Sequence, residues 1–338
     1  MLISVYVPFA VTALLTLLAP RLARGLSPRP AAWALACAAL VTAVGWTGSL
    51  ALLAFTGVAQ IPQVAAEGHW SASALRAEDP VYLVVAAVSA LVLTASVASL
   101  GVAAVRQVRL VVRARRECAA LPGDTELAVL DDDTPVAFAL PGSPGRIVVS
   151  QGMLRRLTDE ERAALLAHER AHLRGRHHLF LALWRLAAAA NPLLRPLAGT
   201  GAFVLERWAD EEAATRVGDR PVVAHAVGRA ALASTGAPRP ALAATGGEVP
   251  QRVRALLAPP PARRRMPFLV GALLLTMCCT SLANAASDSD RMVDTAERAR
   301  CAELLISAST PPVGDHRHGP GFCRCPHHRG ERESVAYR

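Results

Sequence analysis

The chain has 338 residues, of which 52% are hydrophobic and only 19% are charged. So few charges cannot cover the surface of a soluble protein of this length, and the composition therefore excludes an ordinary soluble globular protein. A formal net charge of +9 could indicate a protein that binds nucleic acid. Much of this excess lies beside long apolar runs, however, where anionic lipid attracts it, so direct nucleic-acid binding is not expected.

Four runs without a charged residue explain the composition. They cover residues 1–20, 31–58, 80–105 and 266–287. A helix needs roughly 20 apolar residues to cross a bilayer core, so each run predicts a transmembrane helix. The fourth run follows three arginines and ends in Ala-Asn-Ala-Ala, a pattern that also resembles a signal sequence with a cleavage site after Ala285.

Arginines are concentrated at one end of each run. They occupy the 21–30 loop, the segment 106–116 and positions 263–265, whereas the 59–79 loop has one arginine against three acidic residues. The positive-inside rule therefore predicts a multi-pass protein of the cell membrane, with the lipid bilayer as a partner. The N-terminus and the C-terminal tail would lie outside, and residues 106–265 would form a cytoplasmic domain with its own core.

The cytoplasmic domain begins with short strands and continues with helices. Two or three short strands are predicted in segment 126–154, because the turn-forming residues Asp, Pro and Gly separate its apolar stretches. Thr158 and Glu161 form a capping-box pattern, in which each side chain accepts a hydrogen bond from the other residue's backbone amide. A helix is therefore expected to start there and to run through residues 168–172.

This helix carries the sequence His168-Glu169-Arg170-Ala171-His172. Histidines four residues apart project from one helix face, so both can bind one zinc ion, with Glu169 beside the metal as the general base. The alternative is a chance match on a charged helix, but composition alone gives only about 0.01 such matches in a chain like this.

A catalytic zinc site normally needs a third protein ligand. Glu206 and Asp210 lie four residues apart on another helical stretch, which predicts Glu206 as that ligand and Asp210 as an acceptor from a ligand histidine. The alternative is a solvated acidic face, which is the expectation for Glu211 and Glu212. His177 and His178 are the competing ligands, although they follow Gly175, and surface or membrane-interface positions are expected for them.

Segment 179–194 is apolar, but Arg185 interrupts it and it has only about 15 residues before Pro192. It is too short for a fifth transmembrane helix and predicts a buried or membrane-skimming helix.

These motifs together resemble a known family. His168–His172, Asn191-Pro192 and the stretch Glu206-Arg207-Trp208-Ala209-Asp210 are similar to the zinc-metallopeptidase domain of BlaR/MecR-type signal-transducing proteins. Those are gluzincins, with relatives among the Ste24 and HtpX membrane proteases. The stretch 137–142 and the approach to the helix are similar too. The resemblance implies a multi-span α-helical membrane protein with an inserted, mainly α (α+β) zincin-like metallopeptidase domain and Zn²⁺ as its cofactor.

The resemblance also implies further roles. His225 or Arg229 would stabilise the oxyanion, and Ala137, Phe138 and Ala139 would offer a strand edge to an extended substrate. One feature departs from the family, because the tail at 288–338 contains no Ser-x-x-Lys and the chain has no lysine. A penicillin-binding sensor domain is therefore not expected.

Three functions remain open at this point. The first is a regulatory endopeptidase that cleaves a cytoplasmic protein or peptide, such as a transcriptional repressor. The second is a membrane quality-control protease. The third is a non-catalytic membrane sensor with structural zinc, and the presence of Glu169 argues against it because a structural site needs no base.

The tail at 288–338 is predicted to be disordered, because Gly, Pro and Arg dominate its second half. Weak binding of zinc or copper is the alternative to a tail without a specific role. The candidate ligands are His316, His318, Cys323, Cys325, His327 and His328.

Overall fold

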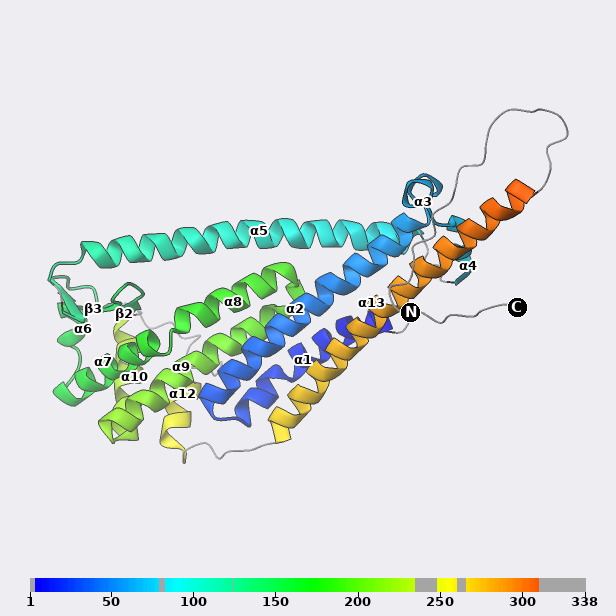
Figure 1. Cartoon of the computed structure of the whole chain (residues 1–338). Coiled ribbons are helices and arrows are strands. Elements are labelled where there is room, and N and C mark those ends of the chain that lie inside the picture. The colour runs from blue at the N-terminus through cyan, green and yellow to red at the C-terminus, as the bar shows by residue number, and fades with distance from the viewer. Residues whose placement is uncertain (1–3, 79–82, 124, 235–247, 260–265, 310–338) are drawn as a thin grey trace, which may run out of the picture.

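The computed structural model describes residues 4–78, 83–123, 125–234, 248–259 and 266–309 (Figure 1). Four helical segments have the length and composition of membrane spans. They contain α1 (Val7–Arg24, after the 3-10 turn Ser4–Tyr6), α2 (Pro28–Ala59), α5 (Leu83–Ala120) and α13 (Met266–Ser309). Within the described residues, these helical segments coincide with the four predicted apolar runs. In Figure 1, α1, α2 and α13 run alongside one another and α5 lies at an angle to them, and α2 contacts the other three.

Two of these helices extend well beyond the predicted spans. Helix α5 continues without interruption past residue 105 and ends at Ala120, where Leu121 precedes a proline and is disfavoured in a helix. The predicted domain boundary at 106 therefore falls inside a helix. Helix α13 continues past 287 to Ser309.

The structure therefore differs from the disorder predicted for the first part of the tail. Residues 288–309 are helical because they pack on the short helix α4 (Ala72–Glu78), which follows the short helix α3 (Pro62–Gly68). Met292 and Ala296 are buried there with Leu75, and the Ser71 hydroxyl donates to Glu303 at 2.9 Å. The candidate metal ligands at 316–328 lie outside the described residues.

Small residues let the long helices approach closely. A Cβ atom added at Gly57 of α2 would lie 1.9 Å from the Cβ of Ala86 in α5, so no larger residue fits there. Contacts of this kind are the usual source of packing energy between helices in lipid. They hold α5 against α2 although most of the apolar window of α5 is exposed.

A small sheet forms the other end of the molecule. Strands β1 (Leu127–Leu130), β2 (Ala137–Leu140) and β3 (Arg146–Ser150) are arranged in the order β1-β3-β2. β1 is parallel to β3, and β2 is antiparallel to it. The central strand β3 is buried along its whole length, which leaves β2 as an edge strand. The prediction of two or three short strands in this segment is confirmed.

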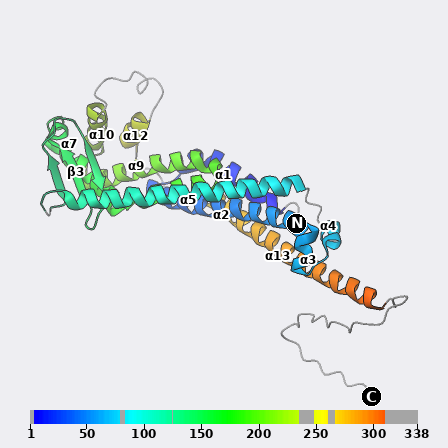
Figure 2. The ribbon, with the colours of Figure 1, turned by 90° about the horizontal axis from the view of Figure 1, so that it is seen from above.

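Helix α7 (Asp159–Arg174) packs on the sheet. Helices α9 (Arg195–Val217) and α10 (Arg220–Ser234) pack on α7, and α12 (Glu248–Leu257) packs on α9 and α10. The short helix α6 (Gln151–Leu154) leads from β3 to α7. Figure 2 shows α10 and α12 together on the side away from α5. Arg220 at the start of α10 donates to the carbonyl oxygens of Ala255 and Leu256, each at 2.9 Å, and so fixes the end of α12.

A helical hairpin connects this end of the molecule with the bundle. Helix α8 (His177–Ala190) and the first half of α9 are joined by a 3-10 turn (Pro192–Leu194) and pack against α1 and α2. Phe180 and Trp184 of α8 share one buried cluster with Leu15 and Leu35 of the bundle. Helix α8 is thus buried, as predicted. Residues 106–265 contain core clusters of their own, and α8 and the first half of α9 also share a cluster with the bundle.

Candidate metal centre and active site

Helix α7 positions the first two candidate ligands. Its start is fixed by the predicted capping box, which is confirmed: the Glu161 amide donates to the Thr158 hydroxyl at 3.3 Å, and the Thr158 amide donates to Glu161 Oε2 at 3.0 Å. The three acidic residues in the first turn stabilise the helix because their negative charges interact favourably with the positive end of the helix dipole. His168 and His172 follow one turn apart on the face that packs against α9.

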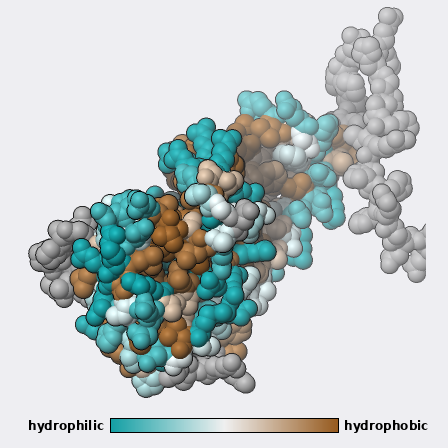
Figure 3. Space-filling view, turned by 90° about the vertical axis from the view of Figure 1, so that its left-hand side faces the viewer, coloured by the Kyte–Doolittle hydropathy of each residue, from teal (hydrophilic) through white to brown (hydrophobic). Residues whose placement is uncertain are grey.

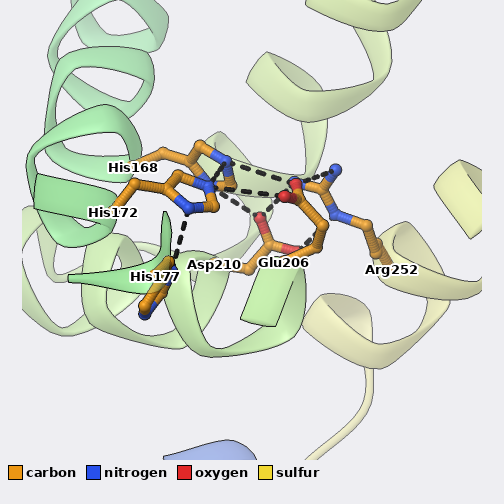
Figure 4. Close-up of polar contacts among 6 residues, drawn as sticks. All are labelled: His168, His172, His177, Glu206, Asp210 and Arg252. Atoms are coloured by element: carbon orange, nitrogen blue, oxygen red, sulfur yellow. Dashed lines mark hydrogen bonds and ion pairs between the residues drawn. The ribbon is translucent and has the colours of Figure 1, made fainter. Parts of the chain in front are cut away.

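Figure 4 shows the imidazole rings of His168 and His172 pointing toward Glu206 of α9. The Nε2 atoms of His168 and His172 lie 3.1 Å apart, and each lies 3.5–3.6 Å from a carboxylate oxygen of Glu206. Tetrahedral ligands at zinc–ligand distances of about 2.0–2.1 Å lie roughly 3.3 Å from one another. The three side chains therefore have the chemistry and spacing to hold one metal ion. Among the described residues, His168, His172 and Glu206 form a group whose ligand atoms all lie within 4.8 Å of one another.

Asp210 and Arg252 lie behind these ligands. His168 Nδ1 is 3.0 Å from Asp210 Oδ1, which leaves the Nε2 atom of His168 free to face a metal. Arg252 of α12 donates to both oxygens of Asp210, at 2.7 and 2.8 Å, and also lies 2.9 Å from Glu206 Oε2. The arginine thus holds both carboxylates of α9 in one orientation. Support of this kind fixes the tautomer and direction of a ligand histidine.

Sequence reasoning missed Arg252. It lies far along the chain from the histidine motif, on a separate helix, beyond residues 235–247, which the structure does not describe. No spacing rule connects it to Glu206 and Asp210. The only signal was indirect, because two buried carboxylates on one helix face require a cation nearby.

His177 supports the second ligand. Its Nδ1 atom lies 2.8 Å from His172 Nδ1, and its ring lies against Trp208 with centroids 4.6 Å apart. If His172 binds a metal through Nε2, its Nδ1–H donates to the unprotonated Nδ1 of His177. His177 is only 1% exposed, so the surface position expected for it is wrong. A Cβ atom at Gly175 would lie 2.4 Å from the His177 ring, which explains the glycine.

The charges in this cluster depend strongly on one another. Burial alone lowers the pKa of His168, but hydrogen bonds to Asp210 and Glu206 outweigh it and raise that pKa to about 10. Burial and the neighbouring His168 charge lower the pKa of His172 to about 4. Burial raises the pKa of Glu206, yet His168 and Arg252 bring it down to about 2. The metal-free site is therefore an ionised network of His168, Arg252 and two carboxylates.

Glu169 lies beside this network in a cavity of about 180 Å³. The cavity is lined by His168, Glu206 and Arg252 and by small apolar residues of α10. Burial raises the pKa of Glu169, and the backbone amide of Ala139 in β2 donates a hydrogen bond to its carboxylate. A carboxylate with a raised pKa next to a metal-ligand cluster has the properties of a general base or acid.

The remaining candidates lie elsewhere. Arg229 pairs with the capping-box residue Glu161 at 3.1 Å, and neither Arg229 nor His225 lines the cavity. His178 is partly buried near Arg176 and Arg115. Glu211 pairs with Arg220, and Glu212 is exposed. In β2, Ala137 lines the cavity and Phe138 is 42% exposed at the sheet edge.

Comparison with known proteins bears on this arrangement. The family model described as Peptidase family M48 matches residues 103–201. The matched segment contains the end of α5, the sheet, the whole of α7 and α8, and stops before Glu206. No solved structure matches the chain. The match to this segment supports a metallopeptidase of the M48 kind.

Proposed function

We propose that this chain is a membrane-embedded, zinc-dependent endopeptidase of the BlaR/MecR type that cleaves a regulatory cytoplasmic protein, such as a transcriptional repressor. The observation that carries the proposal is the convergence of His168, His172 and Glu206 beside Glu169 in a cavity. A structural metal site would need neither the cavity nor the carboxylate.

Each side chain has a role in amide hydrolysis. His168, His172 and Glu206 would hold the ion, which would polarise the scissile carbonyl and lower the pKa of a water molecule. Glu169 would take a proton from the attacking water and deliver it to the leaving amine. Asp210 and His177 would keep the two imidazoles in the tautomers that expose Nε2.

The proposed substrate is an extended segment with apolar side chains near the scissile bond. The edge strand β2 leaves one row of backbone groups unpaired in the sheet, and Ala137 of this strand lines the cavity. Met153, Leu165, Val223, Val227 and Ala230 supply an apolar wall. Figure 3 shows hydrophobic surface at the centre of this end of the molecule, between hydrophilic margins.

Arginine placement supports a cytoplasmic site. The connection between α1 and α2, whose sequence includes Arg21, Arg24 and Arg29, lies at the end of the bundle nearest α9 (Figure 1). The arginines of α5 follow its apolar part in the sequence, in the half of the helix that leads to the sheet. The acidic loop with α3 and α4 lies at the opposite end. This distribution favours the peptidase end on the cytoplasmic side.

One experiment tests activity and sidedness together. Cells producing the wild-type chain would be compared with cells producing Glu169→Gln by quantifying new protein N-termini. The variant keeps the shape of the side chain but not the base, so we expect it to retain bound zinc and to lose cleavage at least a hundredfold. Exposed Glu160→Gln on the same helix is the matched control.

Cleavage retained by Glu169→Gln would overturn the mechanism. New termini confined to extracytoplasmic proteins would overturn the sidedness and with it the regulatory role. Bound zinc is measured separately on the purified chains by elemental analysis.

A further inference from the structure

A second cavity, of about 510 Å³, lies between α2 and the helices α7, α8 and α9. Its charged lining consists of Arg29, Arg174, Arg176 and Glu212, and its apolar lining includes Trp33, Leu179, Leu183 and Trp208. It shares no lining residue with the candidate active-site cavity. We call it the arginine–tryptophan pocket.

In the described part of the chain, the three arginines are not locked in ion pairs, and the nearest acidic groups are Glu212 and, for Arg174, Glu126, whose pKa Arg174 helps to lower. Arg29 instead lies over the Trp208 ring, with its guanidinium carbon 5.6 Å from the ring centroid. Arg176 is held in a left-handed conformation at φ 49°, which few non-glycine residues adopt without a compensating interaction. Because three arginines and only one glutamate line the pocket, its net positive charge favours an anionic ligand.

The rest of the lining favours a lipid as the source of that anion. Arg29 is the second residue of the candidate span α2, and Trp33 follows one turn later with 56% of its surface exposed. Arginine and tryptophan in this order mark the boundary between headgroups and hydrocarbon. Leu179 of α8 is 51% exposed beside them. A phosphate at the arginines would therefore place an acyl chain against Trp33, Leu179 and Leu183.

We propose that the arginine–tryptophan pocket is a binding site for one anionic phospholipid of the leaflet on the peptidase side. The guanidinium groups would bind the phosphate, as arginine forks commonly do. The occupant would touch Trp208, whose ring also lies against His177 and Phe180. Lipid binding does not depend on the peptidase activity proposed above and can be tested without it.

The test is native mass spectrometry of the full-length chain in neutral detergent, titrated with phosphatidylglycerol or phosphatidylcholine. We expect one phosphatidylglycerol to bind with roughly tenfold or greater preference. The triple variant Arg29→Gln, Arg174→Gln, Arg176→Asn should lose roughly 100-fold in affinity, since each basic residue near the surface contributes about a factor of five. Asparagine tolerates the left-handed conformation at position 176.

A matched triple variant, Arg106→Gln, Arg109→Gln, Arg113→Gln, removes the same charge from exposed positions on α5 and should stay within about twofold of wild type. Leu179→Glu introduces a charge at an exposed position and should weaken binding even if the triple variant fails to fold. Equal losses in both triple variants would show nonspecific attraction and overturn the site. Displacement of the lipid by glycerol phosphate at similar concentration would show a free-phosphate site and overturn the lipid assignment.

Discussion

In the bundle, three buried threonines satisfy their hydroxyl groups within their own helix. The hydroxyls of Thr12, Thr42 and Thr56 donate to carbonyl oxygens four residues earlier, at 2.6–2.8 Å. At the end that carries the candidate active site, one buried polar network is ionised, and its members come from three helices: His168 from α7, Asp210 from α9 and Arg252 from α12. The first arrangement survives wherever the helix forms, whereas the second exists only when all three helices are in place. Substitutions in the two regions should therefore differ widely in their effects.

The largest effect is expected at the proposed third ligand. Glu206→Ala removes one of three groups that converge within 4.8 Å, and should weaken zinc binding beyond the 10–100-fold typical of a residue that only supports a ligand. Glu212→Ala, an exposed position on the same helix, is the control. Zinc affinity is measured by competition with a chelator. Equal affinity in the two variants would reassign the ligand, with His177 as the next candidate.

The next effect concerns the cation between the carboxylates. Arg252→Met leaves Asp210 and Glu206 without their common partner, and breaking such a buried pair typically costs about 3–5 kcal/mol. We expect a destabilised metal-free protein, measured by denaturation in mixed micelles. Arg254→Met changes an exposed arginine on the same helix and should have little effect. Similar stability of the two variants would mean that the network is energetically unimportant.

A smaller effect should appear in the pH dependence of zinc binding. Without metal, His168 stays protonated until its pKa of about 10, but a ligand imidazole must be neutral. His172 and Glu206, with pKa values of about 4 and 2, already have the required forms at neutral pH. Zinc affinity should therefore rise about tenfold per unit between about pH 7 and 9, with release of one proton. Calorimetry in buffers of different ionisation enthalpy would detect the proton, and a pH-independent affinity would contradict the network.

The smallest effect is expected in the bundle. Thr42→Val keeps the shape of a fully buried side chain and removes a hydrogen bond that lies within one helix. The free energy of unfolding should change by less than about 1 kcal/mol, as for most polar contacts in membrane helices. The same mixed-micelle denaturation applies. A loss as large as that of Arg252→Met would show that the two regions do not differ in this way.

The local features of this protein were readable from its sequence. Runs of apolar residues indicated the four long helices, and the Thr158–Glu161 pattern marked the start of α7. Spacings of four residues placed His168 with His172, and Glu206 with Asp210, on common helix faces. The helix ends were harder to predict: α5 and α13 continue beyond their apolar runs because contacts with the sheet and with α4 support them.

What the sequence by itself determined follows from short-range rules: hydrophobic length, helix periodicity, capping and the chemistry of a two-histidine motif. Only the tertiary structure decided which residues meet across helices. It brought Arg252 to the two carboxylates, put His177 behind His172, and joined α8 to the core of the bundle formed by α1 and α2. The physical reason is that burial of a charge must be compensated by some partner, but nothing in a local pattern specifies which distant residue will supply it.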